Sequence, residues 1–268
     1  MKYMRLLIML LMIAVVTTGC SSKQNATNPN QNTTLESSGK NDTSVQSSEQ
    51  KILVESFVDY YNKGDANSVI ALLSSDIATE QNSGDQESKS MDEKSVHDSI
   101  KYNILWKHNL KILEWVNADG DNIIIQIEEY GDEYKIMGIN TVLAEMTFGI
   151  KDKKIIKIRT VIDKSSVEQM ILKASGGIGA KVEVYADFIS ISEVAPGLPA
   201  DKAGVKTKDK IVAIDGIKCS LMREGEGFLR LRGPINSKVT LTISRGENEQ
   251  PFDIIVTRED LSKAAVKK

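Results

Sequence analysis

The sequence predicts an α+β protein in which helices come first, antiparallel strands follow, and the whole forms two folded domains. Three observations support this fold class. Apolar residues recur at helical spacing between residues 52 and 107, and then alternate with polar residues from 109 to 163. A second series of short apolar strands, separated by glycine-containing turns, occupies residues 176 to 260. A length of 268 residues also fits about two domains.

Composition argues against a nucleic-acid partner. Hydrophobic residues make up 41% of the chain, charged residues 26%, and the net charge is −3. Lysines and arginines form no cluster interleaved with aromatic residues, which a nucleic-acid-binding surface would need. We therefore expect no nucleic acid, and we also expect no metal ion and no cofactor.

Residues 1–20 have the pattern of a secretory signal peptide. Lys2 and Arg5 precede an apolar run over residues 6–16, which is too short to cross about 30 Å of hydrocarbon. The ending Thr17-Thr18-Gly19-Cys20 resembles a bacterial lipoprotein cleavage box. The resemblance implies that Cys20 carries diacylglycerol with fatty acids such as palmitate, which would anchor the chain to the extracytoplasmic face of the bacterial cell membrane. The alternative is an ordinary signal peptide with an incidental cysteine.

Residues 21–48 are predicted to be a flexible tether. They are almost entirely Ser, Asn, Gln, Thr and Lys, with no apolar periodicity. Such a segment cannot bury enough apolar surface to offset the conformational entropy of ordering it.

Residues 49–164 are predicted to form the first domain. Helical spacing indicates three helices, over residues 52–61, 66–73 and 95–107, and the polar residues 79–91 are expected to be a loop. Period-two alternation indicates strands over residues 109–116, 122–129, 142–150 and 156–163.

Two segments carry a resemblance to the nuclear-transport-factor-2-like fold. They are Phe57-Val58-Asp59-Tyr60-Tyr61-Asn62-Lys63-Gly64-Asp65 and the hairpin from Met146 to Ile156. The resemblance implies helices on a curved antiparallel sheet with a cone-like shape. Some members of that family are enzymes that place an Asp, His or Tyr in a pocket under the sheet. Candidates for such a role here are Asp59, Tyr60, His97 and His108. We expect no convergent titratable pair, no catalytic residue and no enzyme activity.

A short helix over residues 165–175, capped by Ser165 or Ser166, is predicted to connect the two domains. The second domain, residues 176–260, opens with Gly176-Gly177-Ile178-Gly179-Ala180 and an apolar strand. A glycine-rich turn that opens into a strand leaves backbone N–H groups available for an anion. Beside an open strand edge, the matching anion is the terminal carboxylate of an extended peptide.

The segments that follow resemble a PDZ domain. Residues 199–205 match its short helix and residues 209–216 its next strand. The ending Leu229-Arg230-Leu231-Arg232-Gly233 is similar to the PDZ domain of bacterial carboxy-terminal processing proteases, and the resemblance covers about the last third of the chain. It implies a partly open β-barrel with two helices.

The PDZ resemblance implies specific binding residues. The carboxylate would be held by backbone N–H groups in the loop Gly177, Ile178, Gly179 and Ala180, and the peptide would pair with the strand over residues 180–184. The opposite groove wall would be a helix within residues 221–231. The residues implied to line the groove are Val182, Met222, Gly227 and Leu231.

Gly225 and Gly227 depart from the family pattern because each would weaken this helix by about 0.8–1 kcal/mol relative to Ala. Either the helix starts later than residue 221 or the groove wall is mobile.

The sequence thus predicts a membrane-anchored, extracytoplasmic, non-catalytic protein that captures the C-terminal segments of envelope or secreted proteins. A separate protease is a further candidate partner. The chain ends at Lys268, so the resemblance implies peptide binding and not proteolysis. Two alternatives stay open: an adaptor that acts through protein contacts of the first domain, or a small-molecule binder or enzyme that uses the pocket of that domain.

Overall fold

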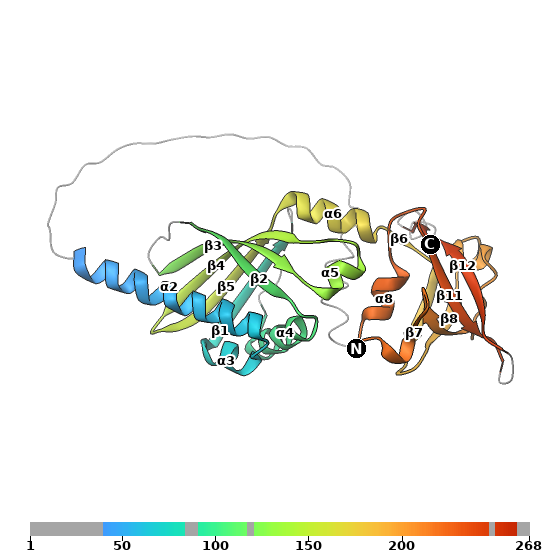
Figure 1. Ribbon diagram of the computed structural model, residues 1–268, viewed down its shortest axis with the longest axis horizontal. Helices are drawn as coiled ribbons and strands as arrows, with labels where there is room; N and C mark the ends of the chain where they lie inside the picture. The colour runs from blue at the N-terminus through green and yellow to red at the C-terminus, as the bar shows by residue number, and fades with distance from the viewer. Residues whose placement is uncertain (1–39, 84–90, 117–120, 247–249, 262–268) are drawn as a thin grey trace.

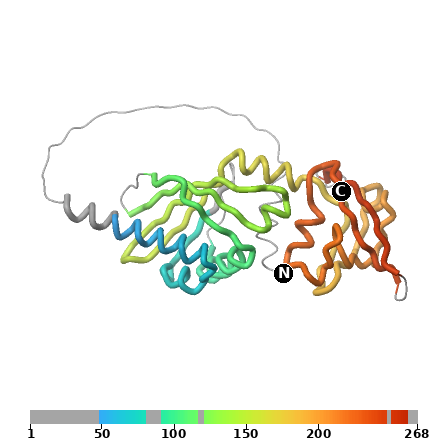
Figure 2. The backbone as a smooth tube through the Cα atoms, viewed as in Figure 1, coloured from blue at the N-terminus to red at the C-terminus, as the bar shows by residue number. Residues whose placement is uncertain are grey.

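The computed structural model describes residues 40–83, 91–116, 121–246 and 250–261. Two domains lie side by side and are joined by helix α6 (Lys164–Ala174), drawn in yellow (Figures 1 and 2). The predicted leader with Cys20, and residues 21–39 of the predicted tether, lie outside the described residues, whereas residues 40–48 of that tether belong to helix α2 (Lys40–Lys63). Within the described ranges, no helix has both the length and the apolar character needed to span a membrane.

The described part of the first domain contains helices of which two, α3 and α4, begin at a side-chain cap. They are α2 (Lys40–Lys63), α3 (Ala66–Ala71), α4 (Glu93–Leu105) and α5 (Asp132–Ile136). The carboxylate of Asp65 accepts from the N–H of Ser68 at 3.0 Å and caps α3, and Asp92 caps α4 in the same way through Ser95. Gly64, with φ of +77°, ends α2.

The sheet of the first domain has the strand order β1-β5-β4-β3-β2. Its strands are β1 (Leu73–Ser83), β2 (Asn109–Val116), β3 (Asn122–Tyr130), β4 (Val142–Lys151) and β5 (Lys154–Ile162). The predicted α+β class is confirmed. The sheet is mixed, because β1 pairs parallel to β5 while the other pairs are antiparallel.

The predicted loop over residues 79–91 was wrong for its first part, since residues 79–83 belong to β1. β1 is an edge strand whose ladder partner is β5, with one further bridge from Thr79 to Met91, so its sequence has no continuous apolar face. Its polar run therefore resembled a loop.

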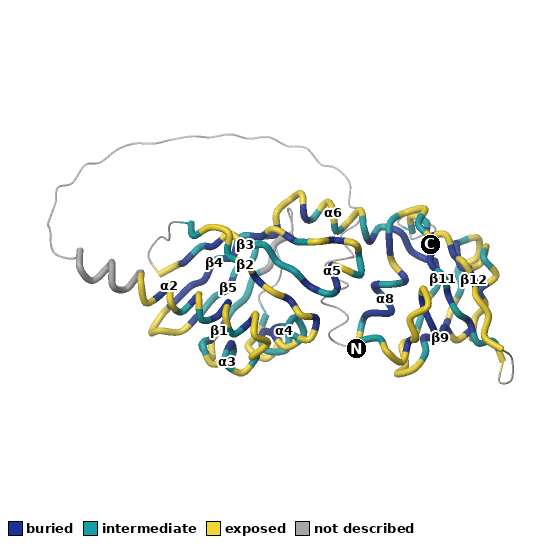
Figure 3. Tube along the Cα trace, in the orientation of Figure 1, coloured by how far each residue is buried: buried dark blue, intermediate teal, exposed yellow. Residues whose placement is uncertain are grey.

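Helices α2 and α4 pack on one face of this sheet (Figure 1), and buried residues follow the inner surface of the domain (Figure 3). The ring of Phe57 on α2 meets that of Phe148 on β4 edge-on, with centroids 5.2 Å apart. Both side chains are almost fully buried, at 2% and 0% exposure.

Helix α6 begins after Asp163, whose carboxylate accepts from the N–H groups of Ser165 and Ser166. The predicted cap at Ser165 or Ser166 was therefore wrong by two or three residues. An aspartate outside the helix satisfies two N–H groups that the serines inside the first turn leave open.

The second domain is a sheet with the order β12-β11-β9-β8-β7, in which β10 pairs with β9, and a separate pair of β6 with β13. The strands are β6 (Gly176–Gly177), β7 (Ala180–Val184), β8 (Ile189–Val194), β9 (Lys210–Ile214), β10 (Ile217–Lys218), β11 (Lys238–Ser244), β12 (Phe252–Thr257) and β13 (Glu259–Asp260). The helices are α7 (Pro199–Lys202), the 3-10 turn η1 (Cys219–Leu221) and α8 (Glu226–Leu231). Fully buried Ile191, Ile211 and Leu241 form the centre of its core.

Helix α8 begins at Glu226, which confirms the alternative that the helix starts later than residue 221. Gly225 precedes the helix as its N-cap, with φ of +84°, where glycine carries no steric cost. Gly227 lies inside the helix, and a Cβ there would be 2.4 Å from Cδ1 of Ile189. The first glycine thus starts the helix, and the second lets α8 approach β8 closely.

The domains meet where α5 faces α8 (Figure 1). Nη1 of Arg223 lies 2.9 Å from a carboxylate oxygen of Asp132, and its guanidinium lies over the ring of Trp106, 4.2 Å from the centroid. Arg223 also pairs with Glu226 at the start of α8. One arginine therefore links the first domain to the helix opposite β7.

Candidate functional site

The loop over residues 177–180 lies beside the C-terminal end of α8. The N–H of Gly176 donates to the carbonyl of Gly233 at 2.7 Å, and the N–H of Gly233 donates back at 3.3 Å. A Cβ on Gly176 would stand 2.8 Å from the Gly233 carbonyl oxygen. Only glycine permits this approach, so the pair of glycines fixes the loop against the end of the helix.

The carbonyl groups of the loop are engaged, while two of its N–H groups are not. The carbonyl of Ile178 accepts from the N–H of Ala200 at 2.7 Å, and that of Gly179 accepts from Ala195 at 3.1 Å. Within the described residues, the N–H groups of Ile178 and Gly179 donate to no protein acceptor. The bonded carbonyls fix the peptide planes of the loop, and the two N–H groups without a protein acceptor are available to an anion.

Gly179 adopts the left-handed conformation that this loop requires, with φ of +72°. A Cβ there would lie 2.5 Å from Cβ of Leu198. On the other side of the loop, a Cβ on Gly177 would lie 2.5 Å from Cδ1 of Leu261. Both glycines are buried, so apolar side chains border the loop and lower the local dielectric around its donors.

Strand β7 continues from the loop and is the terminal strand of its sheet. The N–H of Tyr185 donates to the carbonyl of Phe188 at 3.0 Å, which sets the register of the β7–β8 ladder. Hydrogen-bonded and non-bonded pairs alternate along an antiparallel ladder. Because the pair of Tyr185 and Phe188 is hydrogen-bonded, Val184 and Val182 are in non-bonded pairs. Their N–H and C=O groups point away from β8, toward the unpaired edge.

Ala180 has the same orientation. The N–H of Ala195 donates to the carbonyl of Gly179, so these two residues form a hydrogen-bonded pair at the start of the β7–β8 ladder. The next pair, Ala180 and Val194, is therefore non-bonded. The N–H of Ala180 therefore points away from β8, and it comes directly after the N–H groups of Ile178 and Gly179 that have no protein acceptor.

The four predicted groove residues have different degrees of burial. Val182 and Met222 are partly buried and pack on the edge of the core, as Ala180 does. Leu231 is 5% exposed and belongs to the core itself, and Gly227 is buried between Ile189 and Met222. The side chains of Ala180, Val182 and Met222 are therefore the ones placed at the surface between β7 and α8.

Two buried charged residues hold α8 in place. The guanidinium of Arg258 donates to the carbonyls of Arg230 at 2.7 Å and Leu231 at 3.2 Å, at the end of the helix. Glu226, at its start, accepts two hydrogen bonds from Arg230. Burial would raise the pKa of Glu226, but these bonds and those of Arg223 lower it.

Arg232 was not predicted as a site residue. Its Nη1 lies 3.3 Å from the position of a Cβ on Gly177, and no carboxylate of the described residues pairs with it. The residue as a whole is exposed, yet partial desolvation of the guanidinium lowers its pKa. The sequence signal was present in the Leu229–Gly233 segment, but only the fold shows that its end returns to the loop.

The titratable candidates of the first domain separate into exposed and buried residues. Asp59 pairs with Lys63 on the surface of α2, and Nε2 of His97 is 4.0 Å from Glu93 on the surface of α4. Tyr60 is partly buried at the edge of the core.

His108 is 5% exposed and lies between two glutamates. Its Nδ1 is 2.7 Å from Glu129, and its Nε2 is 3.1 Å from Glu133. Desolvation alone would lower the pKa of His108, but hydrogen bonding and attraction from Glu129 and Glu133 raise it from 6.5 to about 10. The expectation that no titratable groups converge in this domain was therefore wrong. The cluster was missed because α5, which carries Glu133, has no clear sequence signal.

Comparison with known proteins identifies the second domain. A family model described as "PDZ domain" matches residues 168–244. A carboxyl-terminal-processing protease of Synechocystis is 34% identical over 92 residues, which cover 34% of this chain and 22% of that protein. A carboxy-terminal-processing protease of Bartonella bacilliformis is 36% identical over 92 residues, 34% of this chain and 21% of that protein. The chain thus spans about a fifth of the length of these curated relatives.

Solved structures resemble the first domain at low identity. An NTF2-like protein of unknown function from Mesorhizobium loti has a TM-score of 0.39 at 12% identity, and it covers 44% of this chain and 93% of its own. A Mycobacterium tuberculosis LEH-like epoxide hydrolase has a TM-score of 0.37 at 17% identity, with 46% and 88% coverage. These values carry no statement about function. Residues 168–244, in contrast, form a PDZ domain similar to that of the carboxyl-terminal-processing proteases.

Proposed function

We propose that this chain is a binding protein whose PDZ domain captures the free C-terminal ends of other proteins. The peptide adds to β7 as a further strand, and its carboxylate accepts hydrogen bonds from the loop over residues 178–180. Envelope or secreted proteins are the proposed partners, because acylation of Cys20 would anchor the chain at the extracytoplasmic face of the cell membrane. The function is binding without proteolysis, since the similarity to the proteases covers their PDZ region.

The observation that carries this proposal is the row of free donors. Ile178 and Gly179 have no acceptor among the described residues, and Ala180 and Val182 point their N–H groups to an unpaired strand edge. A carboxylate held by such N–H groups forms charge-assisted bonds of about 1.5–3 kcal/mol each before desolvation. Arg232 supplies a positive charge at the same loop without a carboxylate partner in the described residues.

The side chains at the groove indicate the kind of terminal residue that fits. Ala180 is small, and Val182 and Met222 offer an apolar, partly buried surface. Methionine adapts its shape readily, so the groove accepts small or apolar terminal side chains of differing shape.

The test is a calorimetric titration of the full chain with a ten-residue peptide that ends in Val-Ala-Ala. The free-acid peptide is expected to bind at least tenfold more tightly than the same peptide with an amidated terminus, because the amide carries no charge and one of its two carboxylate oxygens is lost. Equal affinity for the two forms would contradict the carboxylate site. No binding of either form would favour an adaptor that acts through the first domain.

Single-residue variants test which residues bind the carboxylate and which bind the backbone of the peptide. Arg232→Ala is expected to weaken the acid peptide several-fold and leave the amide peptide unchanged, whereas Lys238→Ala, which removes an exposed charge on β11, changes neither. Val182→Pro removes one outward N–H from an edge strand, where proline is tolerated, and should weaken both peptides. A Val182→Pro chain that is folded and binds the acid peptide as the native chain does would contradict strand addition.

A further inference from the structure

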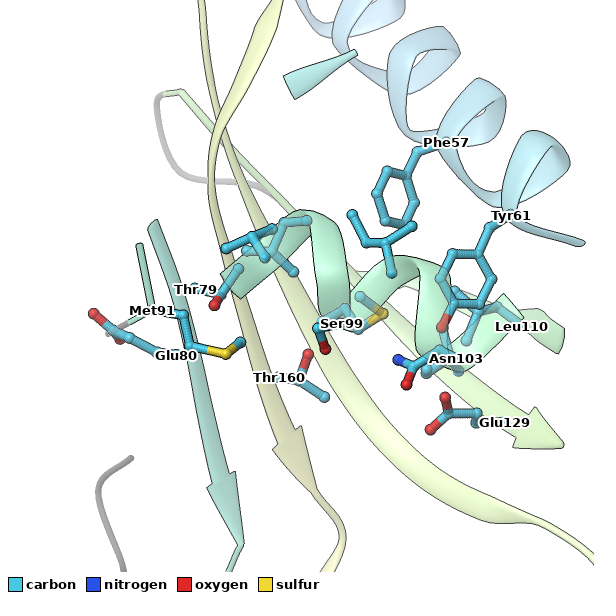
Figure 4. A pocket seen from close by; sticks show the side chains of 15 residues that line it. Phe57, Tyr61, Thr79, Glu80, Met91, Ser99, Asn103, Leu110, Glu129 and Thr160 are labelled. Carbon is cyan, nitrogen blue, oxygen red and sulfur yellow. The ribbon is translucent and has the colours of Figure 1, made fainter. Parts of the chain in front are cut away.

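The first domain contains a cavity of about 120 Å³ that is partly open to solvent (Figure 4). It lies between the helices α2 and α4 and the sheet. Most of its wall is apolar, and the aromatic and aliphatic side chains that contribute include Phe57, Ile100, Ile127, Met146 and Ile158. An apolar cavity of about 150 Å³ is large enough to bind benzene. The cavity here is smaller, at about 120 Å³, so an apolar body of about one ring fits by extending through the opening to solvent.

Polar groups gather at one end of this cavity. Figure 4 shows the hydroxyl of Tyr61, the amide of Asn103 and the carboxylate of Glu129 close together. They come from α2, α4 and β3, so three separate elements converge there. The side chain of Glu129 is only 15% exposed. Burial, with the charge of Glu129, raises the pKa of Tyr61 well above 10.0, so its hydroxyl stays protonated.

The charge behind this polar end is not balanced. Two carboxyl groups, those of Glu129 and Glu133, share one imidazole, that of His108, so the cluster holds more acidic than basic side chains. Tyr134 donates its hydroxyl to Glu129 at 3.0 Å but brings no positive charge. Each carboxylate oxygen of Glu129 accepts one bond from these partners and has a further lone pair available. A buried negative charge is stabilised by a cation that enters the cavity.

An unpaired hydroxyl lies at the other end. Oγ1 of Thr79, on β1, is buried and has no hydrogen-bond partner among the described residues, and Thr79 lines the cavity. Buried polar atoms nearly always have a partner in the protein or in ordered water, so this end of the cavity is suited to a water molecule or a second polar group. No group of three His, Cys, Asp or Glu side chains in the described residues has the arrangement of a metal site.

We propose that this cavity binds a small organic cation, with its amine or amidine head at Glu129 and Asn103 and an apolar body of about one ring against Phe57 and Met146. This site is separate from the peptide groove, and it does not depend on the function proposed for the PDZ domain.

Benzylamine and benzyl alcohol are the matched probes, because they differ mainly in the charge of the head group. In titrations of the full chain followed by calorimetry and by amide NMR, benzylamine should bind at least tenfold more tightly than benzyl alcohol and should shift the side-chain amide of Asn103. Equal affinity for the two probes, or binding of neither, would overturn the proposal.

Three variants locate the binding. Glu129→Gln should remove the preference for benzylamine, whereas Glu128→Gln, on the other face of the same strand and paired with Lys111, should retain it. Ser99→Met fills the cavity from α4, leaves the buried charges in place, and should abolish binding of both probes. Binding of benzylamine that survives in a folded Ser99→Met chain would place the ligand elsewhere and contradict the assignment.

Discussion

Replacing His108 with leucine is expected to lower the free energy of unfolding by about 3–5 kcal/mol, because it leaves Glu129 and Glu133 buried without their shared cation. Both His108 and Glu133 are at most 8% exposed at the side chain, so solvent cannot replace the lost interaction. Chemical denaturation of the full chain at pH 7 measures the effect.

His97→Leu is the matched control, because His97 is the other histidine of the chain, is partly exposed on α4, and approaches Glu93 only to 4.0 Å. It should change stability by less than about 0.5 kcal/mol. Adding Glu129→Gln to His108→Leu should restore part of the lost stability, because it removes one of the uncompensated charges. A His108→Leu chain as stable as the native one would contradict the ion-pair arrangement.

The same cluster gives the native chain a defined pH dependence. The pKa of His108 is about 10 in the folded chain, and about 6.5 is usual for an unfolded one. A group with a raised folded pKa contributes its full stabilisation below the unfolded value and loses it as the pH rises through the folded value. The stability difference between the native chain and His108→Leu should therefore shrink between pH 6.5 and 10. A difference that grows with pH would have the wrong sign.

Gly179→Ala is the second substitution with a large expected effect. The left-handed φ of +72° costs an alanine about 1–2 kcal/mol, and the Cβ would lie 2.5 Å from Cβ of Leu198, a clash that adds about 1–3 kcal/mol. Relief of that clash requires the loop or the chain at Leu198 to move. Thermal unfolding should therefore shift downward, and the affinity for an acid-terminated peptide should fall.

Gly197→Ala measures the cost of the left-handed conformation alone, so the difference between the two alanine variants gives the steric part. Gly197 has the same φ of +72°, but a Cβ there meets nothing within 4 Å. It should therefore cost only the left-handed strain of about 1–2 kcal/mol. Equal destabilisation by the two alanines would show that Leu198 does not constrain the loop.

Regular periodicity made most of the fold predictable from the sequence. Strand β2 was predicted with the bounds that the structure has, since Asn109–Val116 pairs within a half-buried sheet and alternates accordingly. Elements that depend on tertiary packing or strand pairing instead of periodicity were missed. Helix α5 has five residues and is held by Glu133 and Tyr134 inside the domain, and β1 takes its structure from pairing with β5.

The candidate sites differ in the same way: those built from neighbouring residues were predicted, and those built from distant residues were not. The loop with Ile178 and Gly179 was predicted because closely spaced glycines in the sequence indicate a turn with available backbone N–H groups. Arg232 and the His108 cluster were missed because their partners are distant in sequence: Gly177 is 55 residues from Arg232 by number, and Glu129 is 21 residues from His108. Only tertiary structure brings such groups together.

The most direct test of peptide capture is the amide NMR spectrum of the full chain during titration with the Val-Ala-Ala peptide in its free-acid form. A carboxylate held by the loop predicts large downfield shifts for the amide protons of Ile178 and Gly179, and none of that size with the amidated peptide. If these two resonances stay in place while the acid peptide binds, the carboxylate is held elsewhere and the account is contradicted.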